Sequence, residues 1–186
     1  MTDISSLIEE AIKSNCVQSQ RKIYDLYSGM MFATILRICG SRHDAEDILQ
    51  DCFIKVYKGL YQFKGEGSFE GWLRKIATNT SINYIKAKVR ISEIGDNYSN
   101  YSNLNSSTIP HKLQLLDVNY ILSKLSSQNR VVFVLYVFEG YSLKSIAKHL
   151  EIKESACRCR YMRAKRQLKE LVGYYESSVS NYVNVI

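Results

Sequence analysis

The sequence predicts an all-α protein: two small helical domains joined by a flexible linker, with a helix-turn-helix in the C-terminal domain. Most apolar residues of the 186-residue chain recur every three or four positions, the spacing of one helix face. Runs that alternate apolar and polar residues, as half-buried strands do, are almost absent, and Pro110 is the single proline. The periodicity is lost over one central stretch, residues 91–116, which we interpret as the linker.

The N-terminal domain, residues 1–90, is expected to contain four helices. Gly40 should close the second helix, because glycine readily adopts the left-handed conformation of a helix end. Acidic residues crowd the first turn of the third helix, as the helix dipole favours. Apolar stripes predict these helices over residues 4–12, 23–38, 44–56 and 69–84.

The predicted linker is rich in Ser, Asn and Tyr, which is typical of a flexible connection between domains. The alternative is a long structured loop, which is uncommon in compact domains. The C-terminal domain should then cover residues 117–175, with a tail over residues 176–186.

Two helices separated by a three-residue turn form the expected helix-turn-helix. Ser142 can cap the first helix, in which Leu143, Ile146, Ala147 and Leu150 lie on one face. Residues 151–153 make the turn, and the second helix runs over residues 154–172. A further helix, capped by Ser126 and followed by Gly140, precedes the pair.

The positive charge of the chain is concentrated on this motif. The whole chain has a net charge of +7, and residues 141–172 hold nine basic and three acidic side chains, a net +6. A basic second helix is typical of a protein that reads the major groove of DNA. The alternative is a solvated charged face on an ordinary helical hairpin.

No catalytic group and no cofactor are predicted, because phosphate-binding glycine loops and acid–histidine clusters are not found in the sequence. Five scattered cysteines indicate free thiols. His149, Cys157 and Cys159 are an improbable metal site, since positions two apart point to different helix faces. The acidic N-terminal stretch resembles neither a signal peptide nor a membrane segment, so we expect a cytoplasmic protein without membrane insertion.

The order of motifs resembles the extracytoplasmic-function (ECF) group of the sigma-70 family of bacterial RNA polymerase sigma factors. DAEDILQDCFIKVYKGL (residues 44–60) is similar to region 2.2 of that family. YQFKGEGSFEGWLRKIATNTSINYI (residues 61–85) is similar to regions 2.3 and 2.4, and residues 122–171 are similar to region 4.

The resemblance implies a transcription initiation factor that binds core RNA polymerase and directs it to promoter DNA. The acidic helix would bind the clamp helices of the largest polymerase subunit through Asp47, Leu49, Gln50, Asp51 and Phe53. The −10 element would be read by Lys64, Arg74, Lys75, Asn79, Asn83, Lys86 and Lys88. The −35 element would be read by Lys153, Ser155, Arg158, Cys159, Met162, Arg163 and Lys165. An anti-sigma factor is a further implied partner, without any indication of which one.

Several alternatives stay open. Leu49 and Phe53 can equally be core residues, Asn79 and Asn83 can be solvated, and Trp72 fits a core role better than base stacking. The family often has Ser where this chain has Cys159, which leaves the DNA sequence preference undetermined. The rival functions are a helix-turn-helix regulator that does not bind polymerase and a basic helical adaptor.

Overall fold

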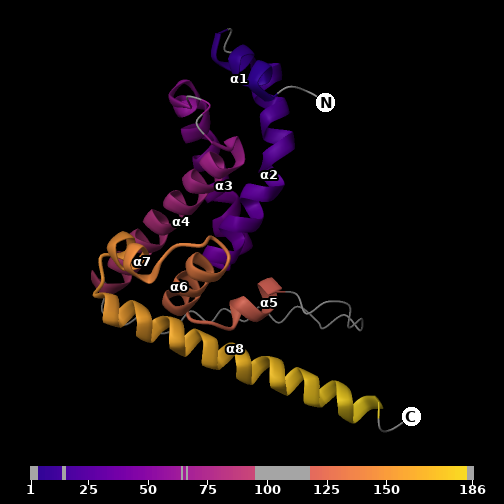
Figure 1. Cartoon of the computed structure of the whole chain (residues 1–186), viewed down its shortest axis with the longest axis vertical. Helices are drawn as coiled ribbons and strands as arrows, with labels where there is room; N and C mark the ends of the chain where they lie inside the picture. The colour runs from indigo at the N-terminus through magenta and orange to yellow at the C-terminus, as the bar shows by residue number, and fades with distance from the viewer. Residues whose placement is uncertain (1–3, 14–15, 64, 66, 95–117, 184–186) are drawn as a thin grey trace. The chain divides into compact units, whose positions relative to one another are not determined.

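A computed structural model of the chain describes residues 4–13, 16–63, 65, 67–94 and 118–183 (Figure 1). Over these residues the chain forms helices and no strand, which confirms the predicted all-α fold. The chain divides into two compact units, residues 1–87 and residues 88–186.

The first unit is built from three α-helices, one 3-10 turn and most of a fourth α-helix, whose last residues lie beyond residue 87. These are α1 (Ile4–Lys13), α2 (Val17–Cys39), α3 (Arg42–Gly59), η1 (Leu60–Gln62) and α4 (Phe69–Ile94). Gly40 ends α2 in the left-handed conformation, with φ 74°, as expected for a closing glycine. The Ser41 hydroxyl then accepts a hydrogen bond from the Asp44 amide and caps α3.

The apolar stripes of these helices meet in one core. Ile23, Met31, Ile35, Ile48 and Leu73 are fully buried there. The packing is reinforced where α2 meets α3, because the Tyr57 hydroxyl donates to the Gln20 carbonyl oxygen at 3.0 Å. The remaining sides of α3 and α4 carry mostly polar side chains, with Ile54 as an exposed apolar residue on α3.

The second unit contains α5 (Val118–Ser123), α6 (Ser127–Val137), α7 (Leu143–Leu150) and α8 (Glu154–Val183). Ser126 and Ser142 cap α6 and α7 through their hydroxyls, as predicted. Val131, Leu135, Ile146 and Cys157 are fully buried between the helices. In Figure 1 the C-terminal half of α8 extends beyond α5, α6 and α7.

The helices are longer than the sequence predicts: α2 begins six residues before the predicted start at residue 23, and α4 and α8 run farthest past their predicted C-terminal ends. α4 continues through Ile94, four residues into the predicted linker, because no Gly or Pro interrupts residues 72–94. α8 continues to Val183 through Gly173, which a helix tolerates at a cost of about 1 kcal/mol. The rest of the predicted linker, residues 95–116, lies outside the described residues. In the part of the chain that is described, no helix is long and apolar enough to cross a membrane.

Candidate nucleic-acid interface

An open pocket of about 330 Å³ lies between α3, η1 and α4 in the first unit. It is lined by Lys55, Gly59, Gln62, Trp72, Ile76, Asn79, Thr80 and Asn83. Both asparagines predicted from the sequence to read DNA therefore face one cavity. A Cβ on Gly59 would lie 3.6 Å from Cζ2 of Trp72, so a larger side chain there would enter this space.

The walls of the pocket combine an apolar and a polar side. Trp72 is half-buried and stacks on Phe69, with ring centroids 5.6 Å apart, so it packs on the core and lines the pocket at once. On the polar side, the Lys55 ammonium group donates to the Thr80 hydroxyl oxygen at 3.1 Å. A flat apolar surface beside fixed donors and acceptors is the combination that an unpaired base requires.

Behind the pocket, Cys52 is a buried neutral thiol. Burial raises the pKa of Cys52 to about 11, and the Thr80 side chain bonds to it. This thiol therefore stays protonated at neutral pH and is inert. Lys55 is the one ionisable side chain among the residues that line the pocket.

The other residues predicted for the −10 element divide between two sides of α4. At about 100° per residue, Lys75, Asn79, Asn83 and Lys86 lie on one side of the helix. Arg74 is half-buried, and both Arg74 and Lys88 lie on another side of α4. Lys64 lies outside the described residues.

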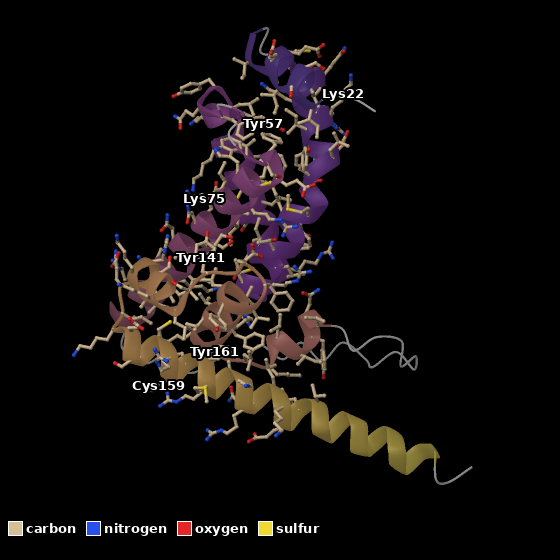
Figure 2. All side chains as sticks on the ribbon, viewed as in Figure 1. Lys22, Tyr57, Lys75, Tyr141, Cys159 and Tyr161 are labelled. Carbon is tan, nitrogen blue, oxygen red and sulfur yellow. The ribbon has the colours of Figure 1, made fainter. Side chains whose placement is uncertain are left out.

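The seven residues predicted for the −35 element are all exposed, on α8 and at Lys153 immediately before it. Cys157 and Ala164 are buried on the opposite side of the helix and hold it against α6 and α7. Figure 2 shows Cys159 pointing away from the unit, whereas Tyr161 points toward α6. Among the described residues, no group of three possible ligands could hold a metal ion.

A tight turn sets the angle between α7 and α8. The Ile152 amide donates to the Ala147 carbonyl oxygen at 3.0 Å, and the Glu151 amide donates to that of Lys148 at 3.3 Å. Glu151 takes a φ of 56°, a left-handed conformation that glycine adopts more easily. The predicted helix-turn-helix is therefore present, with an unusual residue at its turn.

The residues predicted to bind polymerase separate into two groups on α3. Asp47, Gln50 and Asp51 are exposed on its outer side. Leu49 and Phe53 are only 8% and 4% exposed and belong to the core. These two side chains hold α3 in place, and no partner can touch more than a small part of either.

Four residues on these surfaces were not assigned a role from the sequence. Lys55 and Gln62 line the pocket, and Ile54 is 51% exposed beside the acidic residues of α3. Arg166 lies at the centre of the outer face of α8. Helical spacing places Ile54 on the same side of α3 as Gln50 and Asp51, so the sequence could have indicated its exposed position. Nothing in the sequence around Lys55 or Gln62 indicates a pocket.

The two units match known families in sequence. Residues 23–91 match the family described as Sigma-70 region 2, and residues 115–168 match Sigma-70, region 4. The chain is 28% identical over 159 residues to the ECF RNA polymerase sigma factor SigE of Mycolicibacterium smegmatis, covering 83% of this chain and 62% of that protein. It is 26% identical over 182 residues to the ECF RNA polymerase sigma-E factor of Haemophilus influenzae, covering 89% of this chain and 96% of that protein. The chain thus spans less than two thirds of the first of these relatives.

The fold is similar to that of the sigma factor RpoE in its co-crystal structure with the anti-sigma factor NepR from Bartonella quintana. The TM-score is 0.56 at 21% identity, covering 84% of this chain and 98% of that chain. Region 2 and region 4 follow one another in this chain, and their matches together cover about two thirds of it. The chain therefore belongs to the sigma-70 family of RNA polymerase sigma factors, within its ECF group.

Proposed function

We propose that this chain is a transcription initiation factor that binds core RNA polymerase and directs it to promoter DNA. The observation that carries the proposal is the pocket between α3 and α4, which gathers Lys55, Asn79 and Asn83 around an apolar wall. A double-stranded helix offers no base that could enter it. The pocket therefore favours a protein that acts on melted DNA over a regulator that reads duplex alone.

The pocket would hold one unpaired base of the exposed strand. An amide both donates to and accepts from a base edge, so Asn79 and Asn83 can distinguish bases. Trp72 and Ile76 would cover an apolar face of the base. Unstacking a base costs a few kcal/mol, which these contacts must offset. Lys75 and Lys86, on the same side of α4, would attract the phosphates of that strand.

The outer face of α8 would read the −35 element. Arg158 and Arg163 are exposed donors that can pair with guanine in the major groove. Lys165 would contact the phosphate backbone and contribute to the salt dependence of binding. Met162 is 57% exposed on the same face and offers an apolar contact to a thymine methyl group.

The outer face of α3 would bind the clamp helices of the largest polymerase subunit. Asp47 and Asp51 supply negative charge, and Ile54 supplies an exposed apolar side chain between them and Lys58. Opposite charge guides such a complex and fixes its orientation, while the apolar contact is buried on binding. An anti-sigma factor that covers one of these faces is a further proposed partner.

The direct test is reconstitution of transcription. Purified chain is added to core polymerase from its source bacterium, together with a library of genomic promoters. We expect a stable complex on gel filtration and run-off transcripts from a defined subset of promoters. If the chain binds duplex DNA but neither joins core polymerase nor supports transcription, the rival helix-turn-helix regulator is correct.

A further inference from the structure

A large exposed aromatic side chain directly precedes Gln62, a lining residue of the pocket, in the chain. Tyr61, in the turn η1, is 68% exposed, whereas the residues on either side of it in the chain serve other purposes. Leu60 is buried in the core, and Gln62 lines the pocket. Neither the core of the first unit nor the roles proposed above explain the exposure of Tyr61.

The local backbone fixes the direction of this side chain. The Phe63 amide donates to the Leu60 carbonyl oxygen at 3.1 Å, which closes the 3-10 turn. Leu60 and Phe63 are thereby held against the core, and Phe63 packs on Phe69 with ring centroids 5.1 Å apart. The two central residues of the turn, Tyr61 and Gln62, must then lie on its outer side.

The ring of Tyr61 is also coupled to the pocket wall. Its hydroxyl oxygen accepts a hydrogen bond from Nε2 of Gln62 at 3.0 Å. The bond restrains two side chains that would otherwise rotate in solvent. An aromatic ring restrained in this way loses little conformational entropy when it is covered.

We propose that Tyr61 is a stacking position for a second unpaired base of the same DNA strand, adjacent to the base held in the pocket. The proposal rests on the proposed function of the pocket. Successive bases of a single strand each present a flat face, and exposed aromatic rings beside a basic groove are the surfaces on which such bases stack. Gln62 connects the two positions, because it lines one and bonds to the other.

The test measures binding of a fluorescent single-stranded oligonucleotide carrying the −10 sequence to the chain assembled with core polymerase. Tyr61→Ala should weaken binding about five- to 150-fold, the range for loss of one stacked base. Tyr61→Phe keeps the ring and should stay within about threefold of wild type, since only one exposed hydrogen bond is lost. Tyr120→Ala, at a tyrosine 46% exposed in the other unit, is the matched control and should bind as wild type does.

A scan of abasic sites along the oligonucleotide locates the contact. At one position, removal of the base should abolish the difference between wild type and Tyr61→Ala. That position should neighbour the one at which Asn79→Ala shows the same behaviour. If removal of one base abolishes the effect of Asn79→Ala but no base removal abolishes the effect of Tyr61→Ala, the stacking proposal is wrong and the proposed role of the pocket is kept. If neither residue couples to any base, the proposed function of the pocket fails and the stacking proposal fails with it.

Discussion

Arg158 offers a quantitative test of the −35 surface. In the chain without DNA, its guanidinium group pairs with the Glu154 carboxylate at 3.3 Å, one helical turn earlier on α8. Both side chains are well exposed, at 65% and 48%. To reach a base, Arg158 has to exchange this carboxylate for the groove edge of guanine.

The magnitudes favour the exchange. An exposed pair at this spacing contributes about 0.3–0.5 kcal/mol, and a bidentate contact to guanine discriminates by about 1–3 kcal/mol. Arg158→Ala should therefore weaken binding to the preferred −35 duplex by roughly five- to 150-fold. Glu154→Gln releases Arg158 and should strengthen binding about twofold.

The assay is fluorescence anisotropy with a −35 duplex and a set of duplexes that differ at single base pairs. In Arg158→Ala the discrimination should disappear at one base pair and persist at the others. A uniform loss of affinity across the set, with a shallower salt dependence, would refute the reasoning and make Arg158 a phosphate contact.

Three further perturbations test other parts of the structure. Asp51→Lys, on the outer side of α3, should weaken assembly with core polymerase about tenfold or more. The control variant Asp25→Lys, on α2, should assemble as wild type does. If both variants bind core polymerase with the same affinity, α3 is not part of the interface. Binding of a −35 duplex should slow the alkylation of the exposed Cys159, while the alkylation of Cys16 in the first unit stays unchanged. Mass spectrometry measures both rates. If the duplex does not protect Cys159, the DNA binds elsewhere. Thr34→Val should raise the free energy of unfolding, measured by urea titration, by about 1 kcal/mol, because the buried Thr34 hydroxyl has no hydrogen-bond partner. If the variant is less stable than wild type, the hydroxyl forms a hydrogen bond in solution.

The parts of the fold that depend on short-range physics were predictable. The caps at Ser126 and Ser142 and the closing glycine at Gly40 act within four residues of chain, so the sequence shows them directly. The inward face of α8 follows from the spacing of Cys157 and Ala164. The far ends of α4 and α8 are harder to predict, because a Ser- and Asn-rich composition and a single Gly suggest an end where the unbroken helical spacing continues.

The pocket could not be predicted in the same way. Lys55 and Thr80 are 25 residues apart, and they meet only because α3 packs on α4. The packing of α3 on α2 is a second long-range effect: it places the Phe53 ring 4.6 Å from that of Tyr24 and buries Leu49 in the same core, although the motif positions alone left a surface role open for both. Asn79 and Asn83 were found because they share a helix face, whereas Lys55 and Gln62 come from other elements.

The most direct test of the central claim is permanganate footprinting of promoter DNA bound to the chain and core polymerase. Asn79→Ala and Asn83→Ala change two groups of the pocket wall and leave the outer sides of α3 and α8 intact. Both variants should join core polymerase as wild type does but leave the thymines near the −10 element unreactive, because the melted strand is no longer held. Wild-type thymine reactivity in both variants would show that this pocket does not hold the melted strand.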